Sequence, residues 1–490
     1  MSVGKLSNKH GDRAQPLTFA DFSGGLRSDI PANSPQFLPN MLQKAMNVEL
    51  NYLTGKLKVV DGLVPVVKLP APADTLFYNY QDNYFLVNCG RTLYKLSGYL
   101  SPQSEVVSLG QLNGIKRPAY AVYGQYTAIV SGGRVQYYGY KQDLTEVLSS
   151  PASTMCHVRG GRLYVGHTNS ERISMCGAND VTNWQFSSAD QDDWTEQDAW
   201  YADIGPNTGG IAAMMQLEGN LIVVKDSGMT FRFTGDHPSI FNAYDGPKNI
   251  YVVNSDCLLF AGNGLFYVGQ NGFNALNFAA GEYGSLRTDS AGAGVNKDLL
   301  RGVSQKACLW DVAPKKQIWV RADELGNTYL YHYATGVWTM RQFSTPISDV
   351  CLVGNTVYVL AGDTIYKLDE TSDTEVNGNP IQIEVEGKLY TTMDAFLLKR
   401  IGASIDASSA VNAVVSVGEL KLPIGYRADS PYLYDATDYL YDANYPLWTL
   451  TRTSPEQKRQ VYRCDKFSVR LTSTRGAFSL NEIKLEVVGV

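Results

Sequence analysis

The feature that most constrains the fold of this chain is a weak internal repeat. Each copy reads as an apolar strand, a Gly/Asn turn, a short strand of β-branched or aromatic residues, a second polar turn and a further apolar strand. A lone meander of this kind cannot bury both faces or protect its edges. Several meanders arranged radially pack face against face and leave only short edges exposed. The repeat therefore predicts a β-propeller.

Seven copies can be aligned on the residue that precedes the middle strand. Successive steps are 42, 36, 59, 44, 52 and 39 residues, a mean of about 45, which is typical of propeller blades. An irregular β-sandwich or a stack of hairpins remains the alternative. The blade number, six or seven, stays open because one hairpin can complete a blade that begins at the other terminus. The alignment residues are Asn83, Gln125, Gly161, Asn220, Gly264, Lys316 and Asn355.

The composition and the flanking regions agree with an all-β protein. Charged residues are 18 % of the chain, and Gly (45) and Tyr (31) are abundant, as expected of strands and turns. We predict an N-terminal arm with a strand pair over 1–68, a β-propeller over 69–378 and a C-terminal antiparallel, sandwich-like β domain over 379–490. Within the arm, residues 38–45 are the one candidate for a short helix.

Charge and cysteine content narrow the classes of partner. The formal net charge is −6 and no Lys/Arg run forms a stripe, which argues against tight binding to nucleic acid or to an anionic membrane. The N-terminus lacks the apolar stretch of a signal peptide, and no run is long enough to span a bilayer. Seven scattered cysteines without a C-x-x-C pair predict reduced thiols made in a cytoplasm, with no disulfide framework and no zinc site. They are Cys89, Cys156, Cys176, Cys257, Cys308, Cys351 and Cys464.

A search for catalytic chemistry finds little. The histidines lie in no known signature, and the motifs G-x-S-x-G, H-E-x-x-H and G-x-x-x-x-G-K-[ST] are absent. We therefore expect no enzyme, no catalytic residues, no cofactor and no metal site. The histidines are His10, His157, His167, His237 and His332.

Two loops could still bind something. The segment 188–203 gathers carboxylates and tryptophans that could hold a calcium ion or a sugar ring, although it departs from the calcium-loop pattern at two positions, and a solvated loop between blades is the other interpretation. The segment YLYDATDYLYDANY repeats YLYDA at 432–436 and 439–443, which suits either a protein interface or a hairpin packed on its own domain. The residues singled out in the first loop are Asp190, Asp192, Asp193, Trp194, Glu196, Asp198, Trp200 and Tyr201.

Four stretches carry a resemblance to a known family. FSGGLRSDIP (22–31) with NVELNYLTGKLKVVDGL (47–63) resembles the N-terminal arm of many phage structural proteins, where F-x-G-G-L precedes an asparagine-bearing strand. YLYHYATGVWTMR (329–341) and the ending YRCDKFSVRLTSTRGAFSLNEIKLEV resemble tail hub proteins of short-tailed bacteriophages, also called nozzle or packaged-DNA stabilisation proteins.

The resemblance implies a virion structural protein, synthesised in the host cytoplasm. In that family a homohexameric ring lies below the portal and adaptor rings, near tail fibres or a tip protein. It retains packaged DNA and lets it pass at ejection through transient, non-specific contacts, without a membrane partner. Because DNA must slide freely, we predict a ring lumen that is not basic.

Other functions compete with this one. A propeller glycosidase would use the loop 188–203, with two carboxylates converging beside Trp194. A receptor-binding or fibre-adaptor protein at the tail tip would use the propeller as a binding face. A cellular scaffold of the kelch or WD type ranks last, because neither signature recurs in each copy.

Overall fold

The computed structural model describes residues 15–51, 53–139, 142–186, 195, 197–205, 207–235, 241–278, 285–322, 326–407, 411–426 and 456–489. Two compact units are present. The first, here the sandwich unit, comprises Met1–Val64, Thr328–Ser344 and Leu368–Val490, and the second, the propeller unit, comprises Pro65–Asn327 and Thr345–Lys367. Within the described residues, none of the helices is long and apolar enough to cross a membrane.

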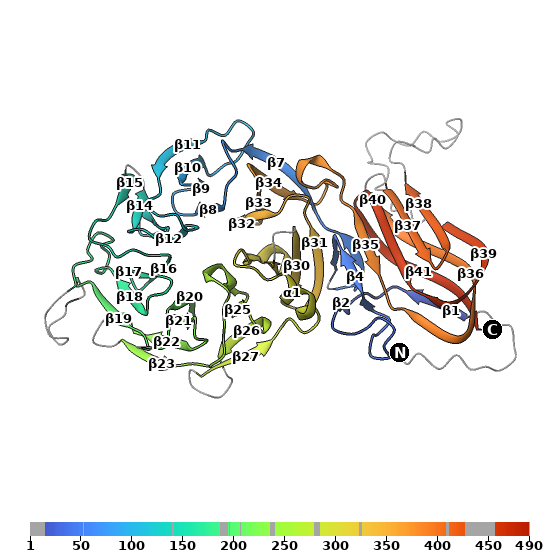
Figure 1. Cartoon of the computed structure of the whole chain (residues 1–490). Coiled ribbons are helices and arrows are strands. Elements are labelled where there is room, and N and C mark those ends of the chain that lie inside the picture. Colours follow the sequence, from blue (N-terminus) through green and yellow to red (C-terminus); the bar gives the residue numbers. More distant parts are fainter. Residues whose placement is uncertain are drawn as a thin grey trace. The chain divides into compact units, whose positions relative to one another are not determined.

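The predicted β-propeller is confirmed. Six separate four-stranded antiparallel sheets follow one another around a ring (Figure 1). Their strands are β8 (Thr75–Asn79), β9 (Tyr84–Cys89), β10 (Thr92–Ser97) and β11 (Val107–Gln111); β12 (Ala119–Tyr123), β13 (Tyr126–Val130), β14 (Gln136–Gly139) and β15 (Gln142–Glu146); β16 (Met155–Arg159), β17 (Arg162–Gly166), β18 (Arg172–Met175) and β19 (Trp200–Asp203); β20 (Ile211–Leu217), β21 (Asn220–Lys225), β22 (Thr230–Thr234) and β23 (Asn242–Asp245); β24 (Leu258–Ala261), β25 (Gly264–Gly269), β26 (Gly272–Phe278) and β27 (Leu286–Ser290); and β32 (Ile347–Val353), β33 (Thr356–Ala361), β34 (Thr364–Asp369) and β7 (Gly62–Lys68).

A further set of four strands has the order of a blade but continues into a larger sheet. The set consists of β28 (Cys308–Val312), β29 (Gln317–Arg321), β30 (Asn327–His332) and β31 (Val337–Gln342). It begins a nine-stranded sheet that proceeds through β4 (Lys44–Met46), β35 (Ile383–Glu386), β40 (Val469–Arg475), β37 (Val411–Val417) and β38 (Leu420–Tyr426). The sequence left open whether there are six or seven blades. Six blades are the separate four-stranded sheets, and the count is seven if β28 to β31, which continue into the larger sheet, are included. The short helical elements are η3 (Ser255–Cys257), α1 (Asn296–Gly302), η4 (Ala313–Lys315) and η5 (Val376–Gly378).

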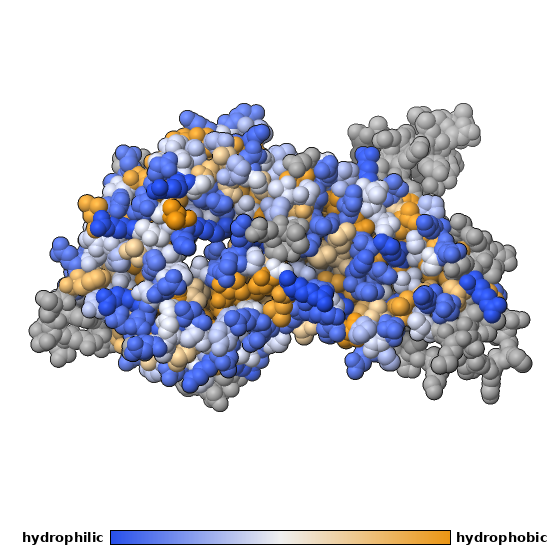
Figure 2. All heavy atoms as spheres, viewed as in Figure 1, coloured by the Kyte–Doolittle hydropathy of each residue, from blue (hydrophilic) through white to orange (hydrophobic). Residues whose placement is uncertain are grey.

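Burial follows the position of a strand within its blade. The second strands are almost wholly buried, as in β9 and β17, because both faces pack on neighbouring blades. The fourth strands are more exposed: β11, β15, β23 and β27 have no buried residue, whereas β19 and β7 are partly buried. Hydrophilic residues cover much of the face drawn in Figure 2. Seven second strands begin at, or one residue after, the positions used for the sequence alignment, which confirms the predicted register of the repeat. The turn before β9 needs the left-handed conformation that Asn83 adopts, with φ 53°.

The sandwich unit combines the N-terminal arm with the C-terminal strands. One sheet has the order β39-β36-β41-β6-β5 with β1 added to β41, and the strands β4, β35, β40, β37 and β38 form the other. Buried residues of the two meet around a small apolar cavity lined by Phe22, Leu471 and Ile483 among others. The strands are β1 (Gln15–Phe19), β2 (Gly25–Leu26), β3 (Met41–Leu42), β4 (Lys44–Met46), β5 (Val48–Leu50), β6 (Leu57–Val59), β35 (Ile383–Glu386), β36 (Tyr390–Ala407), β37 (Val411–Val417), β38 (Leu420–Tyr426), β39 (Glu456–Phe467), β40 (Val469–Arg475) and β41 (Phe478–Gly489).

Two features differ from the sequence prediction or extend it. The helix expected at 38–45 is wrong: this stretch forms β3 and β4, because β3 pairs with β2 in parallel and β4 pairs with β35. The predicted boundaries 1–68, 69–378 and 379–490 also do not coincide with the two units. The arm pairs with C-terminal strands through β1 and β6 on β41, and β7 completes the last blade beside β34. The predicted pair β5 and β6 is present.

Candidate functional site

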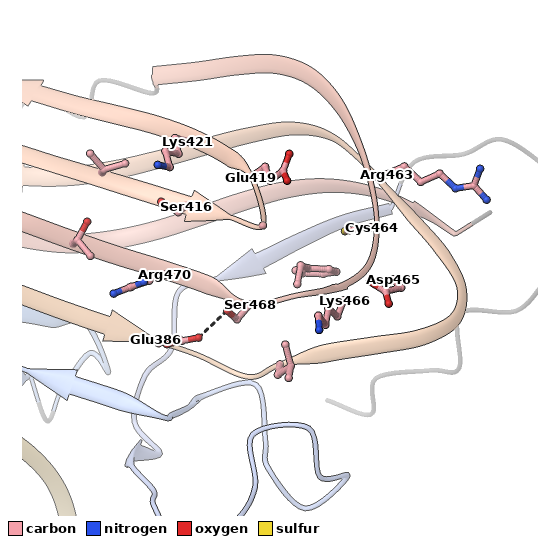
Figure 3. A pocket seen from close by; sticks show the side chains of 15 residues that line it. Glu386, Ser416, Glu419, Lys421, Arg463, Cys464, Asp465, Lys466, Ser468 and Arg470 are labelled. Carbon is pink, nitrogen blue, oxygen red and sulfur yellow. Dashed lines mark hydrogen bonds between the residues drawn. The ribbon is translucent and has the colours of Figure 1, made fainter.

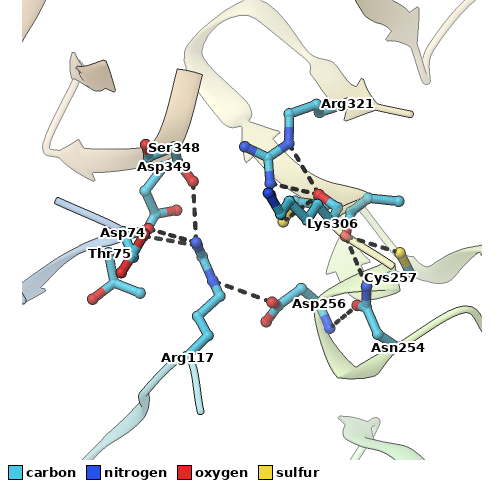
Figure 4. Close-up of polar contacts among 12 residues, drawn as sticks. Asp74, Thr75, Arg117, Asn254, Asp256, Cys257, Lys306, Arg321, Ser348 and Asp349 are labelled. Carbon is cyan, nitrogen blue, oxygen red and sulfur yellow. Dashed lines mark hydrogen bonds and ion pairs between the residues drawn. The ribbon is translucent and has the colours of Figure 1, made fainter. Parts of the chain in front are cut away.

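A polar cluster of the propeller unit is centred on Arg117, in the segment before β12 (Figure 4). Its guanidinium lies between two carboxylates, with Nε 3.1 Å from Oδ2 of Asp256 and Nη2 3.3 Å from Oδ2 of Asp349. Nη1 donates to the carbonyl oxygens of Asp74 and Ser348. One side chain thus joins segments of four blades, those that contain β8, β12, β24 and β32. We call this set, with Trp310, the hub cluster.

Asp349 is the acceptor that completes the hub cluster. Its Oδ2 accepts a hydrogen bond from the Leu76 N–H at 2.8 Å, and its Oδ1 accepts from the Trp310 indole at 2.7 Å and from the Val350 N–H at 3.0 Å. Burial raises the pKa of Asp349, while Arg117 and these donors act in the opposite direction. Because both oxygens already have donors, the carboxylate is suited to tying strands together rather than to taking a proton from a substrate.

The electrostatics of Arg117 fit the same role. Burial disfavours its charge, but Asp349 and Asp256 more than offset this and raise its pKa, so the guanidinium remains charged. Its side chain is 27 % exposed and that of Asp349 is 14 % exposed. A charge-assisted pair of this kind, partly shielded from water, contributes more than a surface ion pair.

A second feature is a wide hollow of about 1100 Å³ in the sandwich unit (Figure 3). It lies on strands β37 to β40 and the turn that leads into β36, and charges of both signs surround it. The Ser468 hydroxyl donates to Oε1 of Glu386 at 3.0 Å. Among the described residues no group of three or more His, Cys, Asp or Glu side chains could hold a metal. The charged lining residues are Glu386, Glu419, Lys421, Arg463, Asp465, Lys466 and Arg470.

The N-terminal motif that carries the family resemblance is built into the sandwich unit. Phe22 is 5 % exposed, and its N–H donates to the Gly55 carbonyl. Gly25 has φ +59°, and a Cβ there would lie 2.3 Å from Cγ1 of Val337 and 2.8 Å from the Trp338 carbonyl oxygen. A side chain at this position would therefore collide with β31, and this explains the second glycine of F-x-G-G-L.

The asparagine of the same motif joins segments that are far apart in the sequence. Asn47 is 4 % exposed and has φ 59°. Its Oδ1 accepts from the Gln342 N–H at 2.8 Å, its Nδ2 donates to the Gln382 carbonyl at 2.6 Å and its N–H donates to the Met340 carbonyl at 2.7 Å. Nearby, Arg341 of the motif YLYHYATGVWTMR pairs with Glu375 at 3.2 Å. The matched motif residues thus hold the arm against β31 and β35.

The acidic loop 188–203 is described only in part. Asp190, Asp192, Asp193, Trp194 and Glu196 lie outside the described residues. Oδ2 of Asp198 accepts hydrogen bonds from the Thr195 N–H at 2.7 Å and hydroxyl at 3.0 Å. Trp200 is 6 % exposed in a blade core, and the Arg172 guanidinium lies 3.7 Å from the Tyr201 ring centroid. These three residues have local packing roles, and the calcium or sugar hypothesis stays a prediction. Both YLYDA segments also lie outside the described residues.

The described histidines are separate from one another. Nε2 of His157 lies 3.0 Å from Oε1 of Gln216, and burial lowers the pKa of His157. His167 contacts the Thr168 carbonyl, and Nδ1 of His332 lies 2.9 Å from the Thr335 hydroxyl. His10 and His237 lie outside the described residues. All seven cysteines are free thiols.

Sequence reasoning missed the hub cluster. Arg117 follows an ordinary Asn-Gly turn in NGIKRPAY. Asp349 lies in a strand, where the alternation of residues predicts which face a side chain is on but not which residues it contacts. The only sequence signal for this cluster was a charged residue in or next to the first strand of a repeat. Such a residue does not by itself identify its partners in other copies of the repeat.

Comparisons with known proteins assign neither a family nor a function. No family model matches the sequence, and no curated protein matches it. Similar solved structures include BamB from Moraxella catarrhalis (12 % identity, 72 % of this chain and 97 % of that chain, TM-score 0.40). PorZ of Porphyromonas gingivalis, described as a surface component of the type-IX secretion system, has 12 % identity, covers 68 % of this chain and 44 % of that chain, and has a TM-score of 0.40. The RRP9 WD40 repeats have 10 % identity, cover 64 % of this chain and 99 % of that chain, and have a TM-score of 0.42. At these values none of the three is a basis for assigning function.

Proposed function

We propose that this protein is a structural subunit of a virus particle, a nozzle or hub subunit at the end of a short phage tail. In this role a homohexameric ring continues the DNA channel below the portal and adaptor rings, retains the packaged genome and lets it pass at ejection. Tail fibres or a tip protein are the further expected partners. The protein acts without catalysis and without a cofactor.

The observation that carries the proposal is the structural use of the N-terminal motif. The residues that resemble phage structural arms, among them Gly25 and Asn47, have steric and hydrogen-bonding reasons to be glycine and asparagine. Because the fold of the arm requires glycine and asparagine at these positions, the motif supports an arm like that of phage structural proteins more strongly than amino-acid composition does. The hub cluster also suits a structural role, since the carboxylate oxygens of Asp349 bond to two other strands of the propeller.

The second candidate function is that of an enzyme, and one observation favours it. Burial raises the pKa of Asp311 to about 6, a value suited to a general acid. Asp311 is a residue of β28, and no second carboxylate is paired with it among the described residues. A glycosidase needs two. The structural role is therefore the better supported proposal.

Electron microscopy of the purified full-length chain, alone and mixed with the portal and adaptor proteins from the same genome, tests the proposal. We expect class averages of a six-fold ring with an open centre that joins the portal assembly. A chain that stays monomeric and never joins that assembly would contradict it. Release of sugar from bacterial surface glycan by the same preparation would instead favour the enzyme.

A further inference from the structure

A groove of about 890 Å³ runs between the outer parts of two neighbouring blades, β8–β11 and β12–β15. Strands β11 and β15 form its walls, and the loop between β10 and β11 forms part of its rim. Leu96, Leu109, Leu144 and the Tyr138 ring contribute its apolar surface, and hydroxyl, amide, carboxylate and ammonium groups surround them. The mixture of lining groups resembles that of ligand sites, in which a few polar groups orient a ligand on apolar surface. The lining residues that carry the polar groups are Lys95, Ser97, Ser101, Gln103, Ser104, Glu105, Ser108, Gln142 and Asp143.

One aromatic ring is held exposed at the rim of this groove. The Tyr99 side chain is 84 % exposed. Its loop is fixed by hydrogen bonds: the hydroxyls of Ser97 and Ser104 donate to the Tyr99 carbonyl at 2.9 and 3.3 Å, and the Ser101 N–H donates to the Ser104 hydroxyl at 2.8 Å. A large ring displayed on a fixed loop offers a binding face at low entropic cost.

The charged groups of the groove are also available to a ligand. The Lys95 ammonium lies 5.3 Å from the ring centroid of Tyr84 and 5.4 Å from that of Tyr138, so two rings hold this donor in place. The side chains of Glu105 and Asp143 are exposed. The groove therefore presents both acceptors and a donor beside an aromatic face.

We infer that this groove binds an oligosaccharide. The apolar C–H face of a sugar ring stacks on an exposed aromatic ring, and its hydroxyls both donate to carboxylates and accept from an ammonium group. An extended peptide fits less well, because it would have to pair with the edge of β11 or β15. The pairing of β11 is irregular at Leu93/Tyr94 of β10, and that of β15 is irregular between Tyr137 and Gly139 of β14. Such irregularities disfavour the addition of a strand.

This inference is independent of ring assembly and differs from the loop 188–203. The test is binding of the full-length chain to an array of neutral-hexose, amino-sugar and uronic-acid oligosaccharides, followed by calorimetric titration of the strongest binder. We expect Tyr99→Ala to raise the Kd at least about tenfold, and Asp143→Asn to raise it by a smaller factor. A bulky Ser108→Trp change, which fills the groove from β11, abolishes binding.

The matched control is Tyr80→Ala, which removes a tyrosine that is 69 % exposed in the β8–β9 turn but does not line the groove. This variant binds like the unaltered chain. Thermal unfolding of every variant shows that the fold is retained, since Tyr99 and Ser108 are exposed. Absence of binding to any sugar class, or binding that Tyr99→Ala and Ser108→Trp leave intact, would overturn the inference.

Discussion

At the scale of single residues, a few polar side chains hold together segments that the repeat alone would leave independent. Arg117 contacts segments from three other blades, and Asn47 bonds to Gln342 of β31 and to Gln382 just before β35, about 300 residues further along the chain. Each of these side chains is surrounded by fixed partners, so its loss leaves buried groups unpaired. Their substitution should therefore cost more than that of any surface charge.

Arg117→Met should lower the free energy of unfolding by about 2 to 4 kcal/mol, because Asp349 loses its counter-charge in a largely buried site. Denaturant titration measures this. The matched control is Arg134→Met, since Arg134 is half exposed and lies 3.8 Å from Glu146. Its change should stay within about 0.5 kcal/mol. Equal effects of the two substitutions would contradict a structural role for the hub cluster.

Asp311→Asn should stabilise the protein in a pH-dependent way. Burial raises the pKa of Asp311 to about 6, so the folded state holds a proton more tightly than the unfolded chain. The carboxyl is protonated in both states below about pH 3, and the cost of ionising it in the folded protein develops between about pH 4 and 6. We expect the variant to gain about 1 to 2 kcal/mol at pH 7.5, a value reduced for partial exposure, and almost nothing at pH 3.5.

The control for this pH series is Asp245→Asn in the exposed strand β23. Because its side chain is exposed, this substitution should change the free energy of unfolding by less than about 0.5 kcal/mol. A gain by Asp311→Asn that is the same at both pH values would show that burial does not perturb this carboxyl.

At the scale of elements, alternation and turn chemistry predicted the blades because each strand is short and local. The second strands begin where the sequence placed them, and the pair β5 and β6 formed as expected. The helix expected at 38–45 failed because pairing with β2 and β35 outweighs local propensity. The polar clusters were beyond prediction, since their members come from different copies of the repeat.

Gly25→Ala tests the packing of the N-terminal motif on β31. An added Cβ would lie 2.3 Å from Val337 Cγ1, and φ is +59°. Gly90→Ala is a near-ideal control, because φ is +58° there and no atom lies within 4 Å of the added Cβ. We expect about 1 kcal/mol of destabilisation at Gly90 from backbone conformation alone, and at least about 3 kcal/mol at Gly25. Similar losses in denaturant titration would argue against tight packing of the arm.

At the scale of the whole molecule, closure of the ring of blades depends on β7. This strand completes the sheet of β32, β33 and β34, and the Leu69 N–H donates to the Asp363 carbonyl at 2.7 Å. Val67 of β7 packs in the same apolar cluster as Phe85, Leu360 and Ile365. The sequence indicated that a terminal strand could complete a blade, but not which strand does so.

Val67→Asp should prevent stable closure, because it places a charge in this cluster at a site that is 3 % exposed. Val64→Asp changes the same strand at a residue that is 38 % exposed and should be tolerated. Thermal unfolding with limited proteolysis compares the two. The first variant should lose at least about 3 kcal/mol and be cut within the blades, and equal resistance to protease would contradict closure by β7.

Completion of the last blade by β7 also has a consequence for synthesis. The ribosome makes β7 before any blade, while its partner β34 emerges only after all the other propeller strands. Until then β7 has no neighbour in its sheet, and the first and last blades cannot meet. We expect closure to be a late, post-translational step that is slow because it joins segments so far apart in the chain. A nascent chain of this protein therefore carries open strand edges for most of its translation, the period in which chaperones protect it best.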